Sequence, residues 1–248
     1  MNTTVSGVGV GVALPTSPAT RWRRDRVFYT VLPIAMAVAI FVGFSPTYYL
    51  KSSFGTPALR PLYHLHGFLF TCWMLLLIVQ PALVAVRRTD VHRRLGVVGG
   101  VLAAGMMVMA FLVTIDLGRR GVGPPGVPPL VFLIVPFSTL IVFPSLIGAA
   151  LWWRRTPEIH KRLILIGTLE LTPAGIARWA VFAPYGPLAY FGLSDLFVLA
   201  MLAHDRTTRG RFHPATILGG LFLVASQVLR IVIGGTETWQ SFAKWLIS

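Results

Sequence analysis

The sequence predicts an all-α membrane protein, a bundle of seven transmembrane helices, from three observations. The first is composition: of 248 residues, 55% are hydrophobic and 12% charged, and the mean hydropathy is +0.72, whereas soluble domains carry about 25% charged residues. The second is that the apolar residues gather in long segments separated by short loops. The third is that the basic residues gather in alternate loops. We therefore expect the lipid bilayer to be the principal partner.

Seven segments are long enough to cross a bilayer, whose hydrocarbon core needs about 20 apolar residues per helix. They are residues 27–47, 62–85, 95–115, 129–152, 162–182, 187–203 and 214–234. These segments predict one transmembrane domain, residues 21–236, with no soluble catalytic domain. Residues 1–20, which are broken by Gly and Pro, are expected to form a disordered cytoplasmic tail. The aromatic-rich residues 237–248 are expected to lie at the membrane interface.

The basic residues predict the orientation of the chain. Fifteen Lys and Arg residues lie before or at the start of the first, third, fifth and seventh segments, and five lie on the other side. By the positive-inside rule, the N-terminus is cytoplasmic and the C-terminus periplasmic. The formal charge of +14 thus reflects topology, and we expect no nucleic-acid partner. The single cysteine, Cys72, excludes disulfides and cysteine-based metal sites within one chain.

Three basic loops share Arg and Thr, a short spacer and a histidine, in RRTDVHRRLG, RRTPEIHKRLI and RTTRGRFHPAT. This recurrence suggests helical hairpins of related design. The histidines have two interpretations: they anchor the helices at the lipid interface, or they converge as ligands of a metal or haem. The candidate metal ligands on the cytoplasmic side are His92, His160, His204 and His213.

Ionisable side chains inside the predicted helices mark the main candidate site, because each costs about 2.5–3.5 kcal/mol to insert. At about 1.5 Å per residue, three of them lie in the outer half, one lies near the midplane and one lies deeper. We expect them to line an outer-half binding pocket formed by His66, Arg178, Arg230, Asp195 and Glu170. A purely structural alternative is that Asp195 and Arg178 form an ion pair between the fifth and sixth helices.

The charges of this pocket favour an anionic ligand. One aspartate facing two arginines leaves a positive charge in a low-dielectric environment, which requires an anion. Glu170 either supplies that balancing charge or is protonated. The sequence thus predicts an anionic cofactor or amphiphile, haem-like or quinone-like, in a redox or cofactor-handling protein. A transporter or lipid-binding carrier is the alternative, and Pro173, beside Glu170, marks where a helix would bend.

Two resemblances extend this interpretation. The seven-helix topology resembles that of the adiponectin-receptor and alkaline-ceramidase superfamily, which implies a metal-dependent hydrolase as a further alternative, although no helix here carries a His-x-x-x-His pair. The motifs HGFLFTCW, HRRLG, HKRL, RGRFHPAT and SQVLRIVIGGTETW resemble an uncharacterised family of bacterial seven-helix inner-membrane proteins. That resemblance implies the bacterial inner membrane and the helix count. It implies no activity, so whether the protein is an enzyme stays open.

Overall fold

The computed structural model describes residues 18–124 and 126–248, and these form helices and connecting turns without a strand. Within this part of the chain, six helices are long and apolar enough to cross a membrane. The all-α prediction is therefore confirmed, and the six candidate spans agree with a multi-pass membrane protein. The disordered tail predicted for residues 1–20 falls mostly outside the described residues, and the first helix begins at Pro18.

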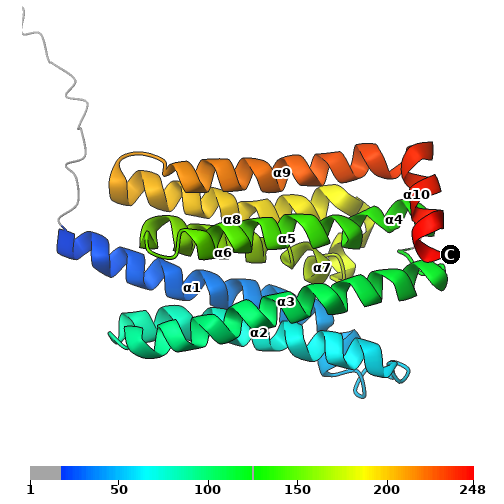
Figure 1. Ribbon diagram of the computed structural model, residues 1–248, viewed down its shortest axis with the longest axis horizontal. Helices are drawn as coiled ribbons and strands as arrows, with labels where there is room; N and C mark the ends of the chain where they lie inside the picture. Colours follow the sequence, from blue (N-terminus) through cyan, green and yellow to red (C-terminus); the bar gives the residue numbers. More distant parts are fainter. Residues whose placement is uncertain (1–17, 125) are drawn as a thin grey trace, which may run out of the picture.

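The long helices lie side by side along one axis, and a short C-terminal helix crosses one end of the bundle (Figure 1). The elements are α1 (Pro18–Phe44), η1 (Ser45–Tyr49, a π-helical turn), α2 (Pro61–Ala85), α3 (Thr89–Arg119), α4 (Pro129–Phe132), α5 (Ile134–Trp152), α6 (Pro157–Leu169), α7 (Thr172–Ile176), η2 (Ala180–Tyr185, a 3₁₀ turn), α8 (Gly186–Arg209), α9 (Pro214–Gly234) and α10 (Glu237–Ile247).

The segment predicted at residues 162–182 is broken into α6, α7 and η2. Pro173 explains the break, because its ring cannot donate a backbone hydrogen bond to the carbonyl of Leu169. That carbonyl instead accepts hydrogen bonds from the hydroxyls of Thr172, at 2.5 Å, and Ser194, at 3.3 Å. Every residue from 165 to 172 is buried. The irregular backbone is therefore enclosed in protein, the setting in which membrane proteins tolerate it.

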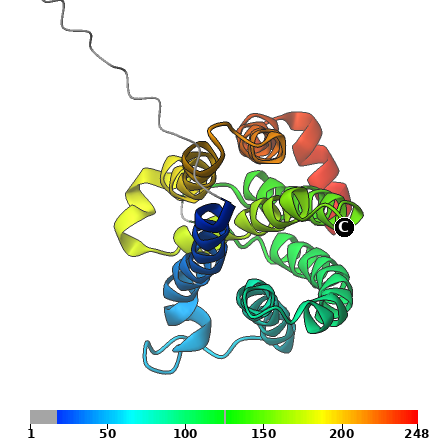
Figure 2. The same ribbon diagram turned by 90° about the vertical axis from the view of Figure 1, so that its left-hand side faces the viewer.

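Helix α6 occupies the interior of the bundle, where it packs against α5, α8 and α9. Viewed along the bundle axis, α2 and α3 lie on one side and α8 and α9 on the other (Figure 2). Helix α7 packs closely on α1. A Cβ atom added to Gly43 would lie only 2.0 Å from the carbonyl oxygen of Gly175, so this contact requires glycine. Small residues permit this backbone-to-backbone contact, as they do between many transmembrane helices.

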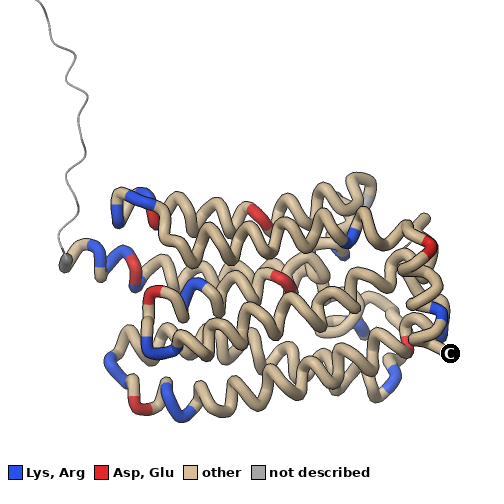
Figure 3. The backbone as a smooth tube through the Cα atoms, turned by 45° about the horizontal axis from the view of Figure 1, so that its top comes forward, with Lys and Arg blue, Asp and Glu red and all other residues tan. Residues whose placement is uncertain are grey.

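Most Lys and Arg residues lie at one end of the bundle (Figure 3). We call it the basic end, formed by the first turns of α1 and the α2–α3, α5–α6 and α8–α9 connections. At the opposite end α10 packs on α3 and α4. Its Trp239 and Ala243 are buried against Leu133 and Ile134. The segment expected to lie at the membrane interface is therefore a helix attached to the bundle.

Candidate functional site

The break after α6 places Glu170 in a buried ion pair with Arg230 of α9. Arg230 Nη2 lies 2.6 Å and 2.7 Å from the two carboxylate oxygens, and the Thr139 hydroxyl of α5 donates to Oε1 at 2.7 Å. Glu170 and Arg230 are each 4% exposed. A carboxylate at the C-terminal end of a helix opposes the helix dipole, so the guanidinium stabilises Glu170 where the helix itself does not. The pair ties α5, α6 and α9 together and is neutral as a unit.

A groove of about 450 Å³ lies beside this pair, between α5, α9 and α10. Most of its lining is apolar and aromatic, and its polar residues include Ser138, Ser226 and Arg230. The three hydrogen bonds of Arg230 all leave from Nη2, to Glu170 and to Ser226 Oγ at 3.2 Å. Its Nε is buried and has no hydrogen-bond partner in the described structure. Because a guanidinium has five N–H donors, the groove combines apolar walls with a cation whose donors are not all used.

Three aromatic rings form the wall of the groove at the end of the bundle opposite the basic end. The centroid of the Phe137 ring lies 5.3 Å from that of Trp239 and 5.4 Å from that of Phe242. The Trp239 indole nitrogen donates to the Leu130 carbonyl at 2.8 Å, which fixes that ring. The packed rings form a wall suited to an apolar chain or a flat ring.

A second groove, of about 390 Å³, lies between α1, α8 and the α7–η2 segment. Its lining, as far as the structure describes it, is apolar and carries no charged side chain; it includes Leu32, Ala39, Ile176, Trp179, Phe182 and Leu196. It lacks the feature that distinguishes the first groove, a buried cation beside an apolar surface.

The other residues of the predicted pocket do not join the Glu170–Arg230 pair. Asp195 of α8 accepts a hydrogen bond from the Gln227 amide at 3.0 Å. Arg178, which follows α7, donates to the carbonyl of Ala174 and lies over the Phe44 ring, 4.1 Å from its centroid. No ion pair connects Arg178 with Asp195 among residues 18–124 and 126–248. The structural pair considered from the sequence is thus absent from the described contacts.

His66 of α2 forms a third, separate group. Its ring centroid lies 4.2 Å from that of Phe70, and its Nδ1 is buried without a hydrogen-bond partner in the described structure. The Arg178 charge is close enough to act on it electrostatically. The predicted pocket is therefore divided into Glu170 with Arg230, Asp195 with Gln227, and His66 near Arg178. Of the two roles considered for Glu170, the contacts match the balancing charge.

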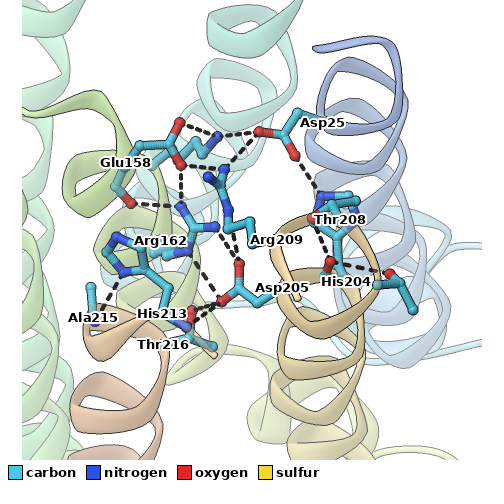
Figure 4. A network of polar contacts seen from close by, with 12 residues as sticks. Asp25, Glu158, Arg162, His204, Asp205, Thr208, Arg209, His213, Ala215 and Thr216 are labelled. Atoms are coloured by element: carbon cyan, nitrogen blue, oxygen red, sulfur yellow. Dashed lines mark hydrogen bonds and ion pairs between the residues drawn. The ribbon is translucent and has the colours of Figure 1, made fainter. Parts of the chain in front are cut away.

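A network of ion pairs joins α1, α6 and α8 at the basic end (Figure 4). Arg162, which is fully buried, pairs with the buried Asp205 and donates to Glu158 Oε2 at 2.7 Å. Arg209 contacts Glu158 and lies 2.9 Å from Asp25. Lys161 Nζ lies 2.8 Å from an oxygen of Asp25 and 3.0 Å from an oxygen of Glu158. The network thus contains three acidic and three basic side chains.

Sequence reasoning missed this network, because it assigned the basic residues of the loops to lipid headgroups. A signal was present: the chain has only eight Asp and Glu residues, and four of them lie in these basic segments, three of which belong to the network. In a membrane protein with few acidic residues, a carboxylate next to arginines predicts a buried ion pair better than the arginines alone do.

The four candidate metal ligands at the basic end lie in three separate settings, of which His92 and His160 share one. His204 Nε2 is 2.7 Å from Asp25, and its ring stacks on another side chain. The rings of His92 and His160 are 6.4 Å apart, and His213 Nδ1 accepts from a backbone N–H of α9 at 3.1 Å. Within the described residues, no group of three or more His, Cys, Asp or Glu side chains is placed to hold a metal ion.

His213 caps the N-terminus of α9, and we expect this cap to make the stability of the protein pH-dependent. Burial first, and the Arg162 charge second, lower the pKa of His213 below its ordinary value of 6.5. The cap requires the neutral imidazole, because Nδ1 accepts the hydrogen bond from Ala215. Its stabilising contribution is therefore complete above pH 6.5 and is lost as the pH falls through the lowered pKa.

We expect His213→Asn to remove this pH dependence, since Asn caps helices without titrating. Between pH 7 and pH 5 the wild type should lose about 1 kcal/mol more of its unfolding free energy than the variant does. Thermal unfolding in detergent at both pH values measures the difference. The exposed His64, replaced by Asn, is the control and should leave the wild-type loss unchanged. An equal loss in wild type and His213→Asn would contradict the capping role.

No family model matches the chain, and no match was found among curated proteins or solved structures. The resemblance to an uncharacterised bacterial family stays a prediction.

Proposed function

We propose that the protein binds an anionic amphiphile in the groove between α5, α9 and α10, with the head group at Arg230 and the apolar part along the aromatic wall. The observation that carries the proposal is Arg230 itself, a buried cation that lines an apolar groove and retains an unpartnered N–H. The volume of about 450 Å³ lies in the range of about 300–1,000 Å³ that is typical of small-molecule sites.

We further propose that the chain crosses a bacterial inner membrane seven times, with the basic end in the cytoplasm and the C-terminus in the periplasm. In this topology α6 and α7 form a discontinuous crossing of about 30 Å, at 1.5 Å per residue. The burial of residues 165–172 supports it. Arg230, near the C-terminal end of α9, then lies in the outer half of the membrane.

Among the functions considered from the sequence, a carrier of amphiphiles fits this arrangement best. Discontinuous transmembrane helices form the substrate sites of many transporters, and here the break between α6 and α7 lies beside the Glu170–Arg230 pair. The groove lining that the structure describes contains no histidine, so it offers haem no imidazole ligand. A quinone-like cofactor in a redox protein is the second candidate, because Phe137, Trp239 and Phe242 can stack on a flat ring.

Filling the groove tests the proposal. Ser138 of α5 lines the groove, whereas Ser145, two turns further along the same helix, does not appear in its lining. We expect Ser138→Trp to weaken binding of a fluorescent long-chain alkyl sulfonate by at least about tenfold, or about 1.4 kcal/mol. Ser145→Trp is the matched control and should bind like the wild type. Equal affinity in both variants and the wild type would reject the groove as the binding site.

A further inference from the structure

Resting on the proposed function, we infer that the groove binds its anionic head group together with one proton, which Glu170 takes up as it releases Arg230. Both carboxylate oxygens of Glu170 lie within 2.7 Å of Arg230 Nη2. A head group within hydrogen-bonding distance of the same guanidinium would lie close to that carboxylate.

Two negative charges at such a distance repel strongly in a site this buried, because little water screens them. Glu170 and Arg230 are each 4% exposed. One cation cannot balance both the carboxylate and the bound anion. A proton on Glu170 removes the conflict without moving any helix.

The charge of the site is conserved by this exchange. Before binding, the site contains one carboxylate and one guanidinium. After binding, it contains one neutral carboxylic acid, one guanidinium and one anionic head group. The proton comes from the aqueous phase and forms an O–H bond on Glu170, and Arg230 stays protonated throughout. The site is neutral in both states, which avoids an uncompensated buried charge.

The surroundings of Glu170 point to this residue as the proton acceptor. Thr139 of α5 can accept a hydrogen bond from the protonated carboxyl, because its hydroxyl both donates and accepts. From α8, which also packs against α6, the titratable groups near this level are Tyr190, which lies in the field of Arg230, and Asp195. Asp195 is bonded to Gln227 and makes no described contact with Arg230. Glu170 is thus the carboxylate that competes with a head group.

The test measures the affinity of the fluorescent alkyl sulfonate as a function of pH. This probe is chosen because a sulfonate stays ionised between pH 5 and pH 9, so any pH dependence belongs to the protein. We expect wild-type affinity to fall about tenfold per pH unit wherever Glu170 is ionised in the free protein. Glu170→Gln should bind with an affinity independent of pH. Asp195→Asn, which neutralises the other carboxyl, is the control and should keep the wild-type slope.

A wild-type slope in Glu170→Gln, or a flat wild-type profile with clear binding, would overturn proton uptake and leave the groove proposal standing. Absence of binding at every pH, or unchanged binding in Arg230→Gln, would instead overturn the proposed function. If Glu170→Gln does not fold, calorimetric titration of the wild type in buffers with different ionisation enthalpies counts the protons directly. One proton taken up per probe supports the inference, and none overturns it.

Discussion

Replacing Arg230 by Gln is expected to lower the free energy of unfolding by about 3–5 kcal/mol, which is the usual cost of removing one partner of a buried ion pair. Glu170 would remain 4% exposed at the end of α6, with Thr139 as its only remaining described partner. The double variant Glu170→Gln/Arg230→Gln should recover most of the loss, because two neutral amides can bond to each other. Chemical unfolding in detergent, followed by tryptophan fluorescence, measures both values.

This variant pair also separates folding from binding. The double variant should be folded but should not retain the alkyl sulfonate, since it lacks the cation. Arg178→Gln is the matched control, because Arg178 makes no described ion pair, and it should change the unfolding free energy by less than about 1 kcal/mol. An equal loss in Arg230→Gln and the double variant would contradict the uncompensated charge of Glu170 as the cause of the loss.

At the basic end, Arg162→Met is expected to lower the free energy of unfolding by about 3–5 kcal/mol as well. Arg162 is fully buried and bonded to Asp205 and Glu158, so its removal leaves a buried Asp205 with less compensation. Thermal or chemical unfolding in detergent measures the loss. The exposed Arg155, in the α5–α6 connection, replaced by Met, is the control and should stay within about 0.5 kcal/mol of wild type.

A further variant distinguishes an ion pair from simple packing. Arg162→Met/Asp205→Leu removes both charges, and such replacements by apolar residues are often neutral or stabilising. We expect it to be clearly more stable than Arg162→Met. If the double variant is less stable than the single one, packing of the Asp205 region, and not its charge, would account for the effect.

The sequence predicts the helical class and most helix positions because hydropathy is a local property of the chain. Pro173 predicts a bend in the segment at 162–182, but not that one helix ends at Leu169 and a separate short helix begins at Thr172, because a proline can either kink a helix or break it. Hydropathy averaged over the segment predicts a single crossing. The structure ends α6 directly before Glu170, the residue that pairs with Arg230.

The sequence does not predict which charged side chains pair with one another. Counting residues along each helix estimates depth, and on that basis Arg178, Asp195 and Arg230 all lie close enough to meet. Depth says nothing about which helix faces which, and the pairing depends on that rotation. The structure pairs Arg230 with Glu170 and leaves Arg178 over the Phe44 ring without a described ion pair. The spare positive charge expected in the outer half is therefore that of Arg178.

Binding of an anionic amphiphile between α5, α9 and α10 can be observed directly. The most direct test is photolabelling with a long-chain alkyl sulfonate that carries a diazirine, followed by mass spectrometry of the labelled peptides. The account predicts label on Ile134–Trp152, Pro214–Gly234 and Glu237–Ile247, and loss of that label in Ser138→Trp. Label confined to α1 and α8, around the second groove, would contradict it.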